Sequence, residues 1–364
     1  MKGRFHIAAF TLTEALVSSS VIVLVLGVML GMTDQTQRLV RGTSSKVEQF
    51  QDARYAFETV TRRLSQATLN TYLDYQYKKV SQNVGGRSVQ VRVPSRYERA
   101  SDLRFLSAPM ASLNATRPNT FQATHGVFFQ APNGYVENTV EHGSLDHLLN
   151  TWGYFVELST DEEFLPDCLK GRVAAKKRYR LMELMEPAER LRVYQFQQPR
   201  GIQWFQPLIS GVNRPIRPIA DNVVALILLP RLAQADEEAQ VRDGKSKVLA
   251  PDYVYDTTQA RSDANLNSKH QLPPVMQVVM VAIDDPSAEK LDKDYRNQSR
   301  LGLDYGSLFT NPELLEDDPA TKVPNDGDIT KFTEMLRDRL HVSSRVFSTN
   351  VSIRGAKWSR SQEN

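Results

Sequence analysis

Cysteine is almost absent from this sequence: among 364 residues only Cys168 carries a thiol. One thiol cannot form a disulfide within the chain, so we expect packing to stabilise the fold even in an oxidising compartment. Hydrophobic residues make up 41% of the chain and charged residues 24%. This composition is ordinary for a globular protein, and a chain of this length can bury a core.

The common catalytic and cofactor-binding motifs are also missing. The sequence contains no GxSxG, Walker, Rossmann or CxxC pattern, and His142 and His147 match neither HxxxH nor HExxH spacing. We therefore expect no enzymatic activity and no cofactor, with an anchored periplasmic enzyme as the least favoured alternative. The acidic residues between 284 and 328 do not follow EF-hand spacing, so a solvated loop is favoured over a calcium site.

A large excess of charge of one sign is missing as well. The formal net charge is +3, which argues against nucleic acid as a partner. The densest basic run, 176–180, is interpreted as the solvated edge of a strand rather than a phosphate site.

Long hydrophobic runs are limited to one, and it lies near the N-terminus. Residues 10–32 contain no Lys or Arg and a single acid, Glu14, and a leader with Lys2 and Arg4 precedes them. As a helix this run measures roughly 30–35 Å, enough to cross a bilayer. An acidic side chain within lipid costs about 2.5–3.5 kcal/mol, so Glu14 needs a partner.

A signal peptide or an uncleaved signal anchor is one interpretation of this segment. A secretory signal has its small-residue cleavage site after the apolar run. Here the small residues Ala8 and Ala9 come before the run, so cleavage at that point retains the helix. A plain anchor also has no use for a carboxylate such as Glu14.

Residues 9–14, with the sequence AFTLTE, resemble the class III signal peptide of type IV prepilins. The resemblance implies that a prepilin peptidase cuts between Ala9 and Phe10 and that the new terminus at Phe10 is N-methylated. It also implies that Glu14 faces the amine of a neighbouring subunit. The residue before the cut is usually Gly in that family and is Ala9 here. Opposite charges attract strongly at low dielectric, so such a pair offsets part of the desolvation of both groups.

Residues 33–71 are predicted to continue the helix as an amphipathic segment. Apolar residues recur at spacings of three and four from Leu39 to Ala67, and the charged face includes Arg62 and Arg63. The sequence thus divides into a leader at 1–9, a transmembrane or filament-core helix at 10–32, this continuation, and a globular domain at 72–364.

The globular domain is predicted to be rich in strands, with a turn at Gly85 and Gly86. Because a helix precedes the strands without β-α-β alternation, the expected fold class is α+β. A long pilin-like helix, half membrane-embedded and half amphipathic, is expected to pack on a mainly antiparallel β-sheet. The runs with strand character are 87–93, 102–106, 126–130, 153–158, 179–184, 191–194, 222–229, 275–283 and 345–354.

Three further expectations concern the second half of the chain. The run at 222–229 is predicted to be a buried central strand. The polar stretch near 231–274 is predicted to be a long loop that contributes little to the core, and the stretch near 284–328 is predicted to be a long solvated loop. A helix is predicted at 330–340, with Asp328 or Thr330 as its cap.

The size of the chain is similar to that of the J-type minor pseudopilins of type II secretion and of the large W-type minor pilins. The sequence most closely resembles the Verru_Chthon cassette protein C family. That family consists of prepilin-type proteins encoded in a pilin-like gene cassette of Verrucomicrobia. The stretches that carry this resemblance are 48–57, 63–72, 125–132, 178–184 and 345–350.

These resemblances imply a minor pilin or pseudopilin that assembles through its N-terminal helix into a type IV pilus-like or type II secretion-like filament. The expected location is the inner membrane, crossed once, with Lys2 and Arg4 in the cytoplasm and the globular domain in the periplasm. After assembly the domain is expected on the filament or the cell surface. The expected partners are other pilin-like subunits, a prepilin peptidase and an assembly platform.

A membrane-anchored adhesin or cargo-recognition domain is the alternative function. Its binding face would use aromatic side chains, although core packing is the favoured role for them. The candidates are Trp152, Tyr154, Trp204, Phe205 and Trp358.

Overall fold

The computed structural model describes residues 12–115, 117–145, 147–194, 204–211, 214–243, 248–260, 267–317 and 326–358, except the side chains of 14–15, 34–49 and 84. The chain divides into two units, Met1–Gln51 and Asp52–Asn364. Helix α1, Leu12–Leu64, begins in the first unit and ends in the second. The expected cleavage site at Ala9 and Phe10 lies outside the described residues.

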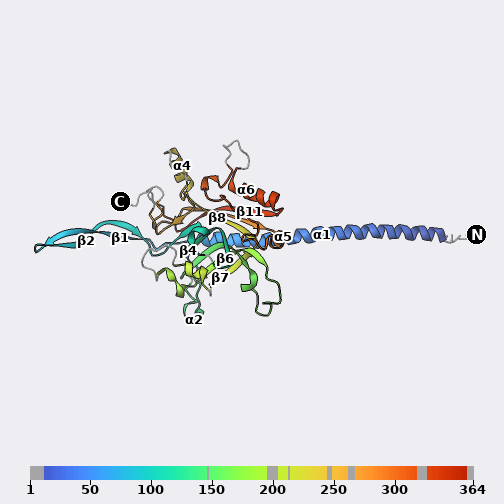
Figure 1. The fold of residues 1–364 in the computed structure, drawn as a ribbon, viewed down its shortest axis with the longest axis horizontal. Coiled ribbons are helices and arrows are strands. Elements are labelled where there is room, and N and C mark those ends of the chain that lie inside the picture. The colour runs from blue at the N-terminus through green and yellow to red at the C-terminus, as the bar shows by residue number, and fades with distance from the viewer. Residues whose placement is uncertain are drawn as a thin grey trace, which may run out of the picture. The chain divides into compact units, whose positions relative to one another are not determined.

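The second unit contains short helices and many strands (Figure 1). Its helices are α2 (Thr139–His142), α3 (Gln206–Ser210), α4 (Gln234–Arg242), α5 (Asp285–Tyr295) and α6 (Asp328–Glu334), with a π-helical turn at Met335–Arg339. Its strands are β1 (Tyr72–Val84), β2 (Arg87–Ala100), β3 (Leu106–Pro109), β4 (Phe121–Pro132), β5 (Leu149–Thr160), β6 (Lys177–Glu186), β7 (Ile216–Asp221), β8 (Val223–Arg231), β9 (Tyr255–Asp256), β10 (Val275–Ile283) and β11 (Ser344–Ser352).

The strands form three sheets. A six-stranded sheet has the order β7-β6-β5-β4-β3-β9, a three-stranded sheet has the order β11-β10-β8, and β1 and β2 form a two-stranded sheet. Neighbouring strands are antiparallel in all three sheets. The α+β class and the antiparallel pairing expected from the sequence are confirmed.

The central strands β4, β5 and β6 of the six-stranded sheet are buried on both faces. On one face Phe128 stacks on Phe205, which precedes α3, with 3.9 Å between ring centroids. On the other face lies β8, whose Leu228 N–H donates to Nδ1 of His125 in β4 at 3.1 Å. Burial on both faces explains why β8 is nearly continuous in apolar residues and why the apolar residues of β5 do not alternate with exposed polar ones. Gly153 in β5 is required by this packing, because a Cβ there would lie 2.5 Å from the Phe128 ring.

A long hairpin, formed by β1 and β2, projects beyond the other sheets of this unit (Figure 1). Gly85 and Gly86 turn it with φ values of 60° and 81°, which suit the two-residue turns that connect antiparallel strands. The predicted turn is therefore confirmed, but the strands run from Tyr72 to Ala100, well beyond the predicted 87–93.

The predicted strand at 222–229 is buried as expected, but it is not central. It forms β8, which is hydrogen-bonded only to β10 within its sheet and lies at the edge of the described strands. Its burial comes from packing against the face of the six-stranded sheet. The apolar content of this run thus predicted its burial correctly, but the predicted central position in a sheet is wrong.

The two stretches expected as loops contribute more to the core than predicted. The stretch 231–274 contains α4 and β9, and its Tyr253 and Leu272 are buried. The stretch 284–328 contains α5, whose N-cap Asp284 accepts a hydrogen bond from Ser287 N–H at 3.0 Å. In both stretches single apolar side chains pack on the core. Because they do not recur at a regular spacing, the sequence pattern does not predict their burial.

Several boundaries also differ from the predictions. Helix α1 ends at Leu64 rather than near 71, because the chain turns there and Thr68 N–H donates to Gln130 O at 3.0 Å. The strand expected at 102–106 begins only at Leu106, and 191–194 contains a 3-10 turn at Arg192–Tyr194.

Helix α6 begins as predicted near 330, but neither predicted residue caps it. Its N-cap is Gly327, and the described residues provide no side-chain capping hydrogen bond. The Asp328 carboxylate instead accepts a hydrogen bond from Phe309 N–H at 2.7 Å. Asp328 therefore ties the preceding segment to α6.

Candidate functional site

The first part of α1 presents an exposed apolar surface. The 18 residues of Leu16–Thr33 form a helix long and apolar enough to cross a membrane, near the N-terminus. Val17, Leu24 and Leu30 are each exposed over more than 60% of their area. Large contiguous apolar surface is unfavourable in water and marks contact with lipid or protein. By length and composition the segment fits a membrane anchor, and a secretory signal shares these properties.

Three hydroxyl groups within this apolar run bond to backbone carbonyls inside the helix. The Ser19 hydroxyl donates to Leu16 O at 2.9 Å, and the Ser20 hydroxyl donates to Val17 O at 2.8 Å. The Thr33 hydroxyl donates to Met29 O at 2.8 Å. A helix in lipid needs such internal bonding, because the surroundings offer no hydrogen-bond partners.

Of the three expected site residues, one falls in a described element. Glu14 lies in the first turns of α1, and its side chain is not among those described. Ala9 and Phe10 precede the described residues. The expected pairing between Glu14 and a neighbour's amine therefore remains a prediction.

The last turn of α1 is fixed to the six-stranded sheet by Arg63. Its guanidinium donates to the Glu183 carboxylate and, at 2.9 Å, to the Tyr154 hydroxyl. It also lies over the Trp152 ring, 3.9 Å from the centroid, a distance suited to a cation–π contact. Glu183 accepts further bonds from Tyr154 at 3.0 Å and from Arg217 at 2.8 Å. We call these five side chains the Arg63 cluster.

The cluster keeps charges buried by pairing them. Burial alone lowers the pKa of Arg63, but Tyr154 and Glu183 outweigh burial and the pKa ends above its usual value. Burial, together with Glu183, raises the pKa of Tyr154. Arg63 therefore stays cationic and the Tyr154 phenol stays neutral at neutral pH. Together with Glu183, they position α1 on the sheet.

Sequence reasoning misplaced Arg63 on the solvent-exposed face of the helix. In the structure Arg62 is exposed and Arg63 is buried. The position itself carried the signal, because residue 63 follows the buried Val60 by three and therefore shares its face. The charge of Arg63 suggested an exposed side chain, whereas its position on the helix indicated a buried one.

The aromatic residues considered for a binding face belong mainly to the core. Trp152, Tyr154, Trp204 and Phe205 are exposed by at most 1%. Trp358 is half-buried. Core packing, the favoured expectation, is confirmed for the first four.

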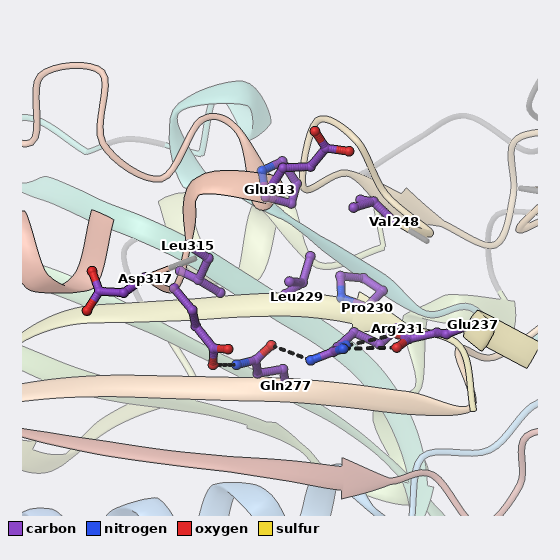
Figure 2. A pocket seen from close by; sticks show the side chains of 11 residues that line it. Leu229, Pro230, Arg231, Glu237, Val248, Gln277, Glu313, Leu315 and Asp317 are labelled. Carbon is purple, nitrogen blue, oxygen red and sulfur yellow. Dashed lines mark hydrogen bonds and ion pairs between the residues drawn. The ribbon is translucent and has the colours of Figure 1, made fainter. Parts of the chain in front are cut away.

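An open cavity of about 410 Å³ lies where β8, β10, α4 and the Pro312–Leu314 turn meet (Figure 2). Apolar side chains and carboxylates both line it. The apolar residues are Leu229, Pro230, Val248, Pro312 and Leu315, and the acidic residues are Glu237, Glu313, Glu316 and Asp317. Arg231 is the single basic residue in this lining. We call this cavity the acidic pocket.

The charge of Arg231 is already neutralised within the pocket. Its guanidinium donates two bonds to Glu237, at 2.9 and 3.0 Å, and one to Gln277 at 3.3 Å. Gln277 in turn donates to Glu316 (Figure 2). The remaining carboxylates leave the pocket with an excess of negative charge, so its chemistry suits a basic group with an apolar neighbour.

Comparisons of the chain with protein-family models, with curated proteins and with solved structures give no match. Among the described residues, no three His, Cys, Asp or Glu side chains come together as metal ligands. Functional inference therefore rests on the chain's own residues.

Proposed function

We propose that this chain is a minor pilin or pseudopilin, anchored in the inner membrane and assembled through α1 into a type IV pilus-like or type II secretion-like filament. A prepilin peptidase cuts between Ala9 and Phe10, and Phe10 becomes the N-methylated terminus. Glu14 pairs with the terminal amine of a neighbouring pilin-like subunit. The globular domain lies in the periplasm before assembly.

One observation carries the proposal: a single helix, α1, changes from exposed apolar surface to a segment embedded in an α+β domain. The exposed part needs lipid or other helices around it. The last turns are fixed to the six-stranded sheet by the Arg63 cluster. A filament subunit needs both properties, whereas a cleaved signal sequence needs neither.

The mature N-terminus tests the proposal most directly. Mass spectrometry of the chain purified from membranes is expected to find methylated Phe10 as the first residue. Met1 at the terminus, or a cut beyond Thr33, contradicts it. Glu14→Ala is then expected to be processed and inserted normally but excluded from filaments, while Thr13→Ala assembles. Normal assembly of Glu14→Ala overturns the role of that carboxylate.

A further inference from the structure

The base of the β1–β2 hairpin is bonded to the rest of the unit, for example through Arg99 and Gln271 at 2.7 Å, but its outer part is not. Between residues 77 and 95 no hydrogen bond or ion pair links it to another described element. At about 3.3 Å per residue its 13-residue first strand spans about 40 Å. A lone two-stranded hairpin is marginally stable in water, and its free edges invite pairing. A surface of this kind is stabilised when another molecule covers it.

One face of the outer hairpin is aliphatic. Val80 lies opposite Val91, Val89 lies opposite Gln82, and Val93 lies opposite Lys78. Directly opposed residues point to the same side of a pair of strands, so the four valines share a face. Val80, Val89 and Val93 are exposed by 38%, 47% and 39%.

The same part of the hairpin is strongly basic. Residues 77–97 contain five basic residues and no acidic one. Among the described residues, Lys78, Lys79, Arg87 and Arg92 have no ion-pair partner, whereas Arg96 pairs with Glu98. The outer hairpin therefore combines exposed valines with uncompensated positive charge.

The acidic pocket has the opposite charge and a matching apolar floor. Glu313, Glu316 and Asp317 form no ion pair with the described residues, and all three are exposed. Leu229, Pro230 and Leu315 line the same cavity (Figure 2). A basic, valine-bearing segment satisfies both features, because its cations offset the carboxylates while its aliphatic side chains cover the floor.

The occupant is a second copy of the chain. Both complementary surfaces belong to one unit, and its hairpin projects away from β8 and α4, which border the pocket (Figure 1). Among the described residues, no hydrogen bond or ion pair joins residues 77–95 to the lining of the pocket. When two different surfaces of one protein fit each other and cannot meet within a molecule, the contact joins copies head to tail.

We propose that residues 77–97 of one copy dock in the acidic pocket of a second copy. This contact goes beyond the proposed function, because it involves neither the cut after Ala9 nor Glu14. Repetition of the same contact links further copies in a row. The attraction is between surface charges, so it weakens as salt screens them.

Two charge-reversal variants of the full chain test the proposal. The hairpin variant carries Lys78→Glu, Lys79→Glu and Arg92→Glu, and the pocket variant carries Glu313→Lys and Glu316→Lys. Self-association is measured by sedimentation in a mild detergent, which disperses contacts between apolar helices. At low salt the wild type is expected to self-associate, and each variant alone about tenfold or more weakly.

Mixing the two variants is the decisive measurement. In the mixture each hairpin meets a pocket of opposite charge, so association is expected to return. Circular dichroism checks that both variants fold, and Arg62→Ala is the matched control for an exposed charge outside both surfaces. A monomeric wild type at low salt overturns the proposal, as does association that the hairpin variant leaves unchanged or the mixture fails to restore.

Other partners of the hairpin give distinguishable results. If the wild type binds vesicles of anionic lipid and the hairpin variant does not, while self-association is equal, the occupant is a membrane and the proposal fails. Glu14→Ala is expected to leave association in detergent unchanged. The experiments therefore distinguish a failure of the filament proposal from a failure of this docking contact.

Discussion

The two ends of α1 belong to one helix and have opposite surroundings. In Leu16–Thr33 the apolar side chains lie all around the helix and are exposed, Leu24 by 68%. In the last turns Ala53, Ala56, Val60 and Leu64 are each exposed by 2% or less, and they repeat at spacings of three and four. The first end therefore needs a partner outside the described unit, and the second already has one.

The difference shows what hydrophobic pattern encodes. A helix that is apolar on all sides requires an apolar environment all around it, such as lipid or a bundle of helices. An apolar stripe requires one wall, which the two sheets supply here. Stability of the domain should thus depend on the second end alone, and the predictions below test this contrast.

Arg63→Ala is expected to have the largest effect, a loss of about 3–5 kcal/mol in the free energy of unfolding, because it leaves the buried Glu183 short of a cation. The matched control is Arg62→Ala, whose side chain is exposed and which should change stability by about 0.5 kcal/mol or less. Urea unfolding of the full chain in detergent, followed by tryptophan fluorescence, measures both. Equal effects of the two substitutions contradict the described role of the Arg63 cluster.

Leu64→Ala against Leu24→Ala compares the two ends with one chemical change. Leu64 is fully buried, so truncation should cost about 2–5 kcal/mol from lost burial and the cavity left behind. Leu24→Ala should leave unfolding of the domain within about 0.5 kcal/mol of the wild type. The same unfolding experiment serves here, and a comparable loss at both sites would show that the first end also supports the domain.

A smaller effect concerns pH. Leu16–Thr33 contains no titratable side chain, so pH dependence must come from elsewhere, and burial raises the pKa of Glu186 to about 7. Because the folded pKa lies above the unfolded value, the stabilising contribution is complete below about pH 4.5 and is lost as pH rises through 7. Allowing for solvent screening, this loss amounts to about 2 kcal/mol.

Glu186→Gln removes the ionisable group. The free energy of unfolding of this variant should therefore rise relative to that of the wild type by about 2 kcal/mol between pH 4.5 and 8. Unfolding curves at a series of pH values give the difference between the two proteins, in which other titrating groups cancel. Glu162→Gln, the same substitution at an exposed position, is the matched control for the change from Glu to Gln. A flat difference for Glu186→Gln would show that burial does not raise the pKa of its carboxyl.

Much of the fold was predictable because its strands are long and apolar. The runs at 126–130, 153–158, 179–184 and 275–283 lie within β4, β5, β6 and β10. The glycine pair at 85–86 fixed the hairpin turn through backbone conformations that other residues rarely adopt. The residue pattern within a short segment was enough to predict these four strands and this turn.

Strand order and isolated core residues were not predictable in the same way. The position of β8 at a sheet edge depends on pairing with β10, about fifty residues later in the chain, which periodicity does not report. Tyr253 and Leu272 are buried by neighbours distant in sequence. Arg63 was missed because its partners, Glu183 and Tyr154, come from two later strands, so only its helical position hinted at burial.

The packing of the last turns of α1 decides where the protein can be divided. A water-soluble fragment that starts at residue 72 discards Val60 and Leu64 and strips Glu183 of a counterion, so it should aggregate or stay unfolded. A fragment that starts at Asp52 keeps the whole compact unit and omits the exposed apolar segment Leu16–Thr33. Expression trials, crystallisation and antigen production should therefore begin at Asp52.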